Sequence, residues 1–257
     1  DGKDVNWFRG TLSRQLSMRL QKLNVTTTVN DTPESITAAF QAYLKACEAR
    51  RAKRLASFTA NSPEIVFTKF RTLRPSFFAY TEGASDARAE CNYIAGGTLS
   101  KIKMNGIWAE EETLMTDEDG VYRDPNLHFD GQHLLFSWKK SAKEDDFHLY
   151  EMDLKTRDIK QLTFGKGHAD IEGIYLPDEN ILFNSTRCGS AVDCWFTEVS
   201  NMYLCDREGR YMRQVGFDQV HTVTPTLLDD GRIVYTRWDY NDRGQVWAQP
   251  LFQMNPD

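Results

Sequence analysis

The sequence has no long apolar run and none of the common catalytic signatures. Its apolar stretches, such as 134–136 and 181–183, are far shorter than the ~20 residues that a membrane-spanning helix needs. It contains no Gly-rich phosphate loop, no Gly-x-Ser-x-Gly elbow and no His-Glu-x-x-His pattern. These absences argue against a transmembrane segment and give no support to the enzyme classes that the three motifs identify.

An excess of positive charge is lacking as well. The chain has 31 Lys and Arg against 37 Asp and Glu, a formal net charge of -6 and a pI near 5.5. The electric field of such a molecule repels polyanions, so we expect no nucleic-acid partner. With 40% apolar and 26% charged residues, the composition is that of an ordinary globular protein.

Cysteine is scarce, and its spacing excludes two kinds of site. The five cysteines form no Cys-x-x-Cys-His pattern, which excludes covalent c-type haem in this chain, and no Cys-x-x-Cys pair that would suggest structural zinc. Cys188, Cys194 and Cys205 fall within eighteen residues. We expect a disulfide between Cys188 and Cys194, with buried free thiols as the alternative. A disulfide would indicate an extracytoplasmic protein, either periplasmic or secreted.

The first 60 residues have the pattern of helices. From residue 32 to about 58, apolar residues recur at helical spacing, acidic residues come early and basic residues come late. Thr32 is the expected N-cap and Pro33 the expected first helical residue. A weaker helical pattern covers residues 10–23. We therefore predict an N-terminal helical segment over residues 1–60.

Beyond residue 61 the sequence changes to short β runs that repeat about every 50 residues. Turns at 130–131, 177–180 and 230–231 each precede an apolar strand, at 134–137, 181–183 and 233–236. Second strands follow at 149–153, 202–206 and 251–255, and outer strands at 159–164 and 212–217. Four strands in a repeat of this length are typical of a β-propeller blade. We predict about three and a half four-stranded blades of the TolB or WD40 kind over residues 61–257.

The last predicted blade stops where the others turn into their outer strand, which would leave an open sheet edge. We therefore expect a truncated or split β-propeller, in which other domains or subunits complete the ring.

One face of the predicted propeller, the near face, carries two histidines at its blade connections. His168 and His221 each lie between an outer strand and the next inner strand, 53 residues apart, and Arg123 lies close to the corresponding place one blade earlier. Convergent histidines suit a divalent metal (calcium, zinc or manganese) or a general base. The alternative is that each histidine only caps the following strand. His128, His133 and His148 lie in strands and are interpreted as structural, as are the Asp-Gly turns.

Long loops at 187–198 and 237–244, which come directly before the strands at 202–206 and 251–255, reach the same face and are rich in charged and aromatic residues. They are candidates for binding a partner or a polar small molecule such as a saccharide; the alternative is an internal salt-bridge network that clamps neighbouring blades. Asp239 and Asp242 could also bind calcium. With Arg123, the candidate ligand-binding residues are Arg187, Trp195, Glu198, Arg237, Asp239, Asp242 and Arg243.

Several runs of the sequence are similar to one large bacterial family. They cover residues 193–201, 217–221, 230–232, 235–240 and 250–257, and the resemblance extends over about 65–257. The family is named for the middle domain of the hydrazine synthase alpha subunit. The resemblance implies a TolB-like β-propeller in a secreted multidomain protein. Hydrazine synthase makes hydrazine from nitric oxide and ammonium at c-type haems, for which this chain has no attachment motif.

The leading functional hypothesis is a non-catalytic β-propeller module of a larger exported protein, whose near face docks a partner domain, a subunit or a ligand. The first alternative is a metal-dependent lyase or hydrolase that acts on anionic saccharides, as some TolB-like propellers such as oligogalacturonate lyases do. His168 and His221 would then hold the metal, and Arg187 and Arg237 would hold the substrate. The second alternative is a subunit of a haem enzyme whose haems lie outside this chain.

Overall fold

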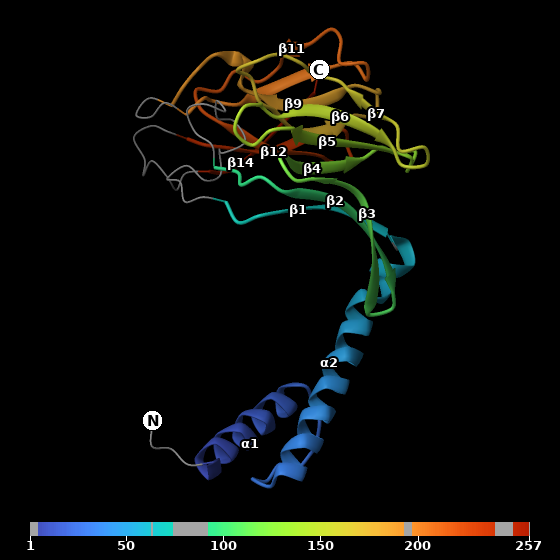
Figure 1. Ribbon diagram of the computed structural model, residues 1–257, viewed down its shortest axis with the longest axis vertical. Coiled ribbons are helices and arrows are strands. Elements are labelled where there is room, and N and C mark those ends of the chain that lie inside the picture. The colour runs from blue at the N-terminus through green and yellow to red at the C-terminus, as the bar shows by residue number, and fades with distance from the viewer. Residues whose placement is uncertain (1–4, 63, 74–91, 193–196, 240–248, 257) are drawn as a thin grey trace. The chain divides into compact units, whose positions relative to one another are not determined.

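The chain folds into two units, one helical and one built of β-sheets. The computed structural model describes all residues except 1–4, 63, 74–91, 193–196, 240–248 and 257. The helical unit comprises Asp1–Ile65 and Ile102–Glu111, and the sheet unit comprises Val66–Lys101 and Glu112–Asp257. The described chain is mainly β, with four antiparallel sheets and two α-helices (Figure 1). None of the described helices is long and apolar enough to span a bilayer.

The two helices pack against each other as a hairpin. Helix α1 covers Val5–Lys22 and helix α2 covers Pro33–Asn61. The predicted start of α2 is confirmed, because the Thr32 hydroxyl accepts a hydrogen bond from the Ser35 backbone N–H at 3.3 Å. Leu16, Leu20 and Ala39 form the buried contact between the helices. This is a small core for two helices, and α2 leaves large apolar side chains such as Phe40 exposed.

The four sheets follow the chain as simple meanders. The first sheet has β1 (Glu64–Phe70), β2 (Gly97–Asn105) and β3 (Trp108–Asp117), and the second has β4 (Val121–Leu127), β5 (His133–Lys139), β6 (His148–Asp153) and β7 (Ile159–Gln161). The third sheet has β8 (Asp170–Tyr175), β9 (Ile181–Ser185), β10 (Asn201–Cys205) and β11 (Arg213–Gln214). The fourth sheet has β12 (Thr222–Leu227), β13 (Ile233–Arg237) and β14 (Leu251–Met254). Residues 74–91, between β1 and β2, lie outside the described residues. The repeat expected from the sequence is confirmed for the second and third sheets.

Two local features of the meander follow directly from residue chemistry. Gly131 and Gly231 have positive φ angles of 69° and 86°, as the predicted tight turns require. The outer strands β7 and β11 are shorter than expected. Each ends where a glutamine side chain donates to the carbonyl two residues later, from Gln161 to Thr163 and from Gln214 to Gly216.

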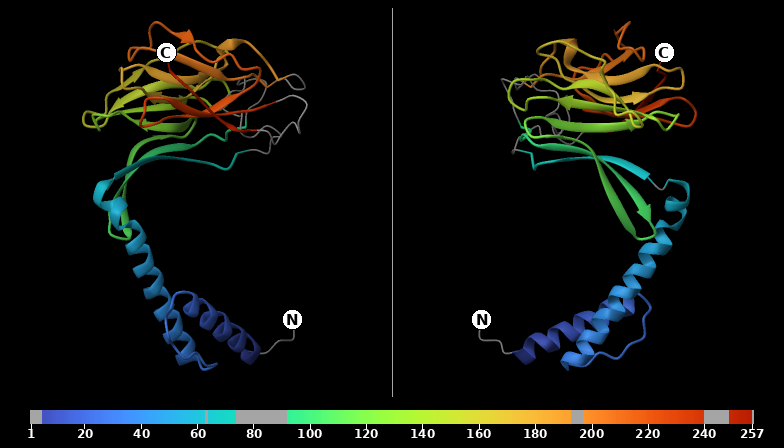
Figure 2. Two further views of the ribbon diagram at one scale, coloured as in Figure 1. Left: turned by 180° about the vertical axis from the view of Figure 1, so that it is seen from behind. Right: turned by 45° about the vertical axis from the view of Figure 1, so that its right-hand side comes forward.

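Successive sheets pack face to face through apolar clusters. Leu135 and Leu149 of the second sheet pack with Phe183 of the third, and Met202 of the third packs with Tyr235 of the fourth. The first strands also lie side by side, since β4 contacts β8 and β8 contacts β12. Figure 2 shows the same order of sheets from two further sides. This order places β4, β8 and β12, the first strands of the second, third and fourth sheets, at a common inner edge, where the candidate site lies.

Candidate functional site

The three inner strands share an irregularity at the same level. Strand pairing shifts by one bulge between Arg123 and Asn126 in β4, and at the corresponding places in β8 and β12. The first residue of each bulge has a positive φ, at 53° for Asp124, 56° for Glu172 and 51° for Thr224. Positive φ is uncommon for residues other than glycine, and bulges redirect side chains. The repetition shows that the three strands are built alike at this level.

These bulges are linked from one sheet to the next by a chain of hydrogen bonds. The Asp124 carboxylate accepts the backbone N–H of Glu172 at 3.0 Å, and the Glu172 carboxylate accepts the backbone N–H of Thr224 at 2.6 Å. Each bulge therefore supplies an acceptor to the bulge of the following sheet. Arg123 donates to both carboxylates, at 2.5 Å to Asp124 and 3.2 Å to Glu172, and Asn184 donates to Glu172 at 2.8 Å.

The charges around this series of hydrogen bonds indicate a structural role for its residues. Burial raises the pKa of Glu172, against the lowering effect of the Arg123 guanidinium, and the charge of Asp124 adds to the rise. The Arg123 guanidinium lies 5.9 Å from the Tyr93 ring and 5.7 Å from the Phe147 ring, within cation–π range. Arg123 is thus held by two carboxylates and two aromatic rings, so a ligand would have to displace existing contacts to reach it.

The two predicted metal histidines occupy the expected connections but differ in environment. His221 is fully buried, and its Nδ1 accepts the Ser200 backbone N–H at 3.1 Å. Its ring stacks on the Trp238 ring, with the ring centroids 5.7 Å apart. Burial lowers the pKa of His221 to about 3. His168 is half-buried and packs over Gly165, where an added Cβ would sit 2.8 Å from the ring. The two histidines also differ in their distance from the bulge. His168 lies three residues before Ile171, the last paired residue before the bulge of β8, whereas His221 lies two residues before Val223, the equivalent residue of β12. A metal shared by the two histidines stays a prediction.

Arg187 and Arg237 are engaged in ion pairs with acidic residues of the same sheets and loops. Arg187 donates to both carboxylate oxygens of Asp170, at 3.0 Å and 2.8 Å, and Asp170 is fully buried. Burial would raise the pKa of Asp170, but hydrogen bonds from His148, Arg187 and Ser185 hold it below its usual value. Arg237 lies 3.1 Å from Asp218 and 3.3 Å from Asp239.

The remaining candidates are only partly described. Glu198 is half-buried, and its backbone bridges Ala191 across the loop. Trp195, Asp242, Arg243 and Cys194 lie outside the described residues. Cys188 has a free thiol that donates to the Val199 carbonyl at 3.1 Å. The structure thus does not show the predicted bond from Cys188 to Cys194, and Cys194 itself lies outside the described residues.

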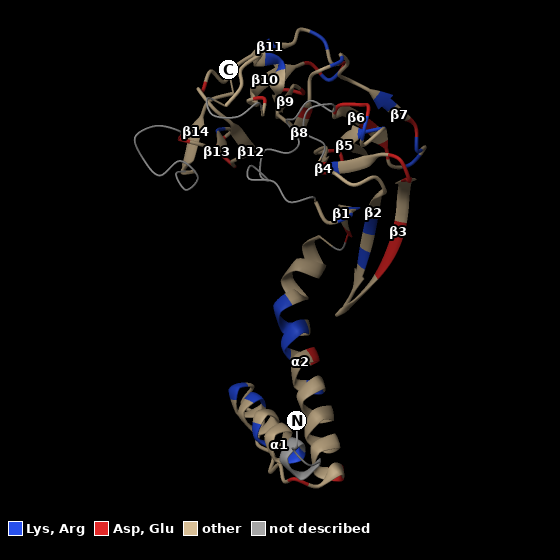
Figure 3. Ribbon diagram, turned by 60° about the vertical axis from the view of Figure 1, so that its left-hand side comes forward, with Lys and Arg blue, Asp and Glu red and all other residues tan. Residues whose placement is uncertain are grey.

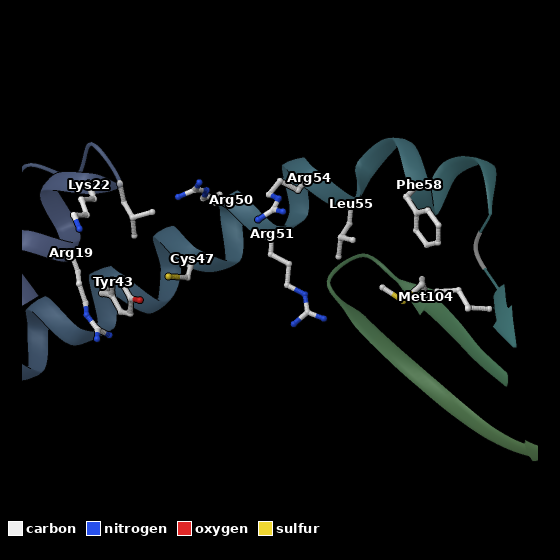
Figure 4. A pocket seen from close by; sticks show the side chains of 12 residues that line it. Arg19, Lys22, Tyr43, Cys47, Arg50, Arg51, Arg54, Leu55, Phe58 and Met104 are labelled. Carbon is white, nitrogen blue, oxygen red and sulfur yellow. The ribbon is translucent and has the colours of Figure 1, made fainter. Parts of the chain in front are cut away.

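The sequence reasoning missed a groove in the helical unit. Its volume is about 800 Å³, and all twelve lining residues belong to that unit. None of the twelve is acidic, and five are basic: Arg19, Lys22, Arg50, Arg51 and Arg54. Figure 4 shows these cations along α1 and α2, with Leu55, Phe58 and Met104 at one end. A local charge count would have found it, because residues 1–62 hold ten Lys and Arg against five Asp and Glu.

No protein-family model and no curated protein match the chain. Solved structures resemble it at low identity. TolB from Acinetobacter baumannii is 18% identical, covering 62% of this chain and 41% of that chain, with a TM-score of 0.41. Hydrazine synthase from Kuenenia stuttgartiensis is 16% identical (68% and 27% covered, TM-score 0.49), and an oligogalacturonate lyase from Vibrio parahaemolyticus is 14% identical (62% and 45% covered, TM-score 0.43). The chain thus spans less than half the length of these three proteins, and its membership of the hydrazine synthase middle-domain family stays a prediction.

Proposed function

We propose that the chain is a non-catalytic β-propeller module of a larger exported bacterial protein, and that its basic groove docks an acidic segment of a protein partner. The observation that carries the proposal is the composition of the groove, which combines five cations and several apolar side chains with no acid. A propeller architecture is supported by the successive meanders, whose inner strands lie side by side and repeat the same bulge.

The state of the near-face residues supports a binding module over an enzyme. Among the described residues, Arg123, Arg187 and Arg237 each pair with a carboxylate of the protein itself. His221 is buried, with a pKa held far below neutrality, so it remains uncharged at neutral pH inside the fold. Groups held in this way reinforce the sheets, whereas general acid–base catalysis needs a group within reach of substrate.

The charge distribution favours a protein segment with both acidic and apolar residues. The helical groove is positive, while residues 63–257 carry 21 Lys and Arg against 32 Asp and Glu. Figure 3 shows the contrast, with α1 and α2 mostly blue among the charged residues. Amphipathic segments bind grooves through apolar anchors, and complementary charge speeds their association and fixes their register.

The near face offers an alternative docking surface. Phe164 and Phe217 each lie three residues beyond the outer strand of neighbouring sheets and are 62% and 78% exposed. Two large apolar side chains at equivalent positions of a repeat suit a flat docking surface for another domain or subunit. The variants described below distinguish binding at this surface from binding at the groove.

The docking proposal is tested with a fluorescent helical peptide of repeating Glu and Leu, and a matched peptide in which Gln replaces Glu. We expect the full chain to bind the acidic peptide, with an affinity that falls as salt is raised. Replacing Arg50, Arg51 and Arg54 by Gln should weaken binding at least tenfold. The double variant K45Q/K53Q is the matched control, because both lysines lie on α2 outside the groove.

Four results would contradict the proposal. Equal loss of binding in the control double variant would show a diffuse charge effect. Loss of peptide binding in F164S/F217S, with no change in the arginine variant, would show that the docking site is on the near face. Tighter binding to anionic phospholipid vesicles than to the peptide would show that the groove binds a membrane rather than a protein. Cleavage of oligogalacturonate in the presence of manganese would instead support the lyase.

A further inference from the structure

A cluster of two histidines and an aspartate lies at the turn between β4 and β5. It consists of His128 and Asp130 in the turn and His133 at the first position of β5. In the described part of the chain, this is the group of three metal-type side chains whose ligand atoms all lie within 4.8 Å of one another. The turn and the connection that holds His168 lie at opposite ends of the strands, since the three antiparallel strands β5, β6 and β7 come between them.

The three ligand atoms meet at one carboxylate oxygen. Asp130 Oδ2 lies 2.9 Å from Nδ1 of His128 and 2.7 Å from Nδ1 of His133. Two ligands of a tetrahedral zinc ion, each about 2.0–2.1 Å from the metal, lie roughly 3.3 Å apart. The two histidine nitrogens would therefore move about half an ångström away from Asp130 Oδ2 to admit one small cation.

The two ring nitrogens of His128 have different neighbours. Its Nε2 lies 3.2 Å from the Glu179 carboxylate and 3.5 Å from an Arg207 guanidinium nitrogen. Its Nδ1 lies 3.2 Å from the backbone nitrogen of Asp130, which donates to it, and 2.9 Å from Asp130 Oδ2. Nδ1 is therefore the ring atom of His128 that faces the central carboxylate of the cluster.

The surroundings of the cluster orient its ligands. Glu179 holds the far side of the His128 ring, and a carboxylate in this position is the usual partner of a metal-bound histidine. Asp130 Oδ1 accepts the backbone N–H groups of Gln132 and His133 at 2.7 Å and 3.1 Å. These bonds fix the carboxylate so that Oδ2 faces the two rings.

We propose that His128, Asp130 and His133 form a binding site for a divalent transition metal, with Glu179 orienting His128 and zinc as the best-suited ion. Two imidazoles and one carboxylate suit zinc and its neighbours, whereas calcium and magnesium prefer oxygen ligands only. Asp130 and His133 are about one-third exposed, at 32% and 30%, so an ion can enter from solvent. The remaining coordination positions would be filled by water.

Arg207 is the competing cation at this site. It reaches to 4.0 Å from Asp130 Oδ2 and 3.5 Å from His128 Nε2. It is also paired with Glu151 at 3.0 Å and Glu179 at 3.1 Å, which balance its charge. A metal would therefore approach from the His133 side of the carboxylate, and the affinity of the site should be moderate.

The test is calorimetric titration of the full chain with zinc chloride, with cobalt absorption spectra as a second readout. We expect one equivalent of zinc to bind with a Kd tighter than ~10 μM. The variants D130N and H133Q should each weaken binding more than tenfold and abolish the cobalt spectrum. D130N retains Oδ1 for the two backbone N–H groups, so the turn itself should persist.

The matched control is H168Q, which removes a half-buried histidine outside the cluster and should leave zinc affinity unchanged. The melting temperature of each variant without metal shows whether it folds. Zinc should raise the melting temperature of the wild type and of H168Q, because it binds the folded state. Zinc binding weaker than ~1 mM, or equal in wild type, D130N and H133Q, would overturn the proposal. Loss of binding in H168Q alone would place the metal at the near face instead.

Discussion

Two buried carboxylates lie two residues apart in β8 and respond in opposite ways to burial. Asp170 receives hydrogen bonds from Arg187, Ser185 and His148, and these hold its pKa below the usual value. Glu172 shares its arginine with another carboxylate, so burial dominates and its pKa is raised. The balance between burial, hydrogen bonds and neighbouring charges decides the direction of the shift for each carboxylate.

Removing Glu172 should be costly. Glu172→Ala leaves Arg123 without one partner and the Thr224 backbone N–H without its acceptor, so we expect a loss of about 3–5 kcal/mol in the free energy of unfolding. Urea denaturation measures it. Glu208→Ala is the control, because Glu208 forms an exposed pair with Lys160 and should change stability little. Equal effects of the two substitutions would show that the inner-strand chain does not stabilise the fold.

His221 should make the protein acid-sensitive. Its pKa is about 3 when folded and about 6.5 when unfolded, so below pH 6.5 the unfolded chain binds a proton that the folded chain does not. Stability should therefore fall from pH 6.5 downwards, by up to ~1.4 kcal/mol per pH unit from this residue. His221→Gln should be less stable at pH 7 but should lose this slope between pH 6.5 and 4.5. An unchanged slope in urea denaturation would assign the acid sensitivity to other groups.

At the scale of elements, the inner strands combine regular pairing with a strained bulge. Each of β4, β8 and β12 pairs normally before and after the bulge, and each bulge contains one residue with positive φ. Asp124 and Glu172 compensate for the strain by accepting a hydrogen bond from the next sheet. Thr224 has an exposed side chain, so its contribution is mainly the backbone conformation.

Relieving that strain should stabilise β12. Thr224→Gly removes the Cβ that opposes positive φ, and we expect a gain of about 1 kcal/mol in the free energy of unfolding. Thr236→Gly in β13, where φ is not positive, should lose about 1 kcal/mol. Thermal denaturation of the two variants gives the comparison. If both substitutions destabilise equally, the bulge is not a strained conformation for threonine.

At the scale of the whole molecule, charge separates the helical segment from the sheets. The net excess of base in residues 1–62 and of acid in the remainder partly cancel in the overall value of -6. The negative overall charge therefore gives no sign of the basic groove, although it agrees with the acidic composition of residues 63–257. An acidic segment would be attracted to the helices and repelled by the sheets, which would favour one docking site.

The predicted disulfide tests the compartment of the whole protein. If the chain is exported, we expect Cys188 to be joined to Cys194 in protein recovered from an oxidising compartment. Mass spectrometry of digests prepared without reductant identifies the linked peptides. Cys205 is an unfavourable alternative partner, because burial raises the pKa of its thiol to about 12. Free Cys188 and Cys194, or a bond from Cys194 to Cys205, would remove this support for export.

The sequence by itself determined the features that depend on neighbours along the chain. The cap of α2 at Thr32, the turns at Gly131 and Gly231, and the strands of the repeat depend on side-chain type and periodicity, so they were predictable. The place of His168 and His221 before the inner strands followed from the same repeat.

Only the tertiary structure decided which side chains meet across sheets and helices. The series of hydrogen bonds from Asp124 through Glu172 to Thr224 joins residues about 50 positions apart, and the three equivalent bulge positions hold three different residue types. His128 and His133 appear in the sequence as ordinary strand residues, and only the turn geometry brings both onto Asp130. Contacts of this kind depend on how strands pack in three dimensions, which composition and spacing along one chain do not specify.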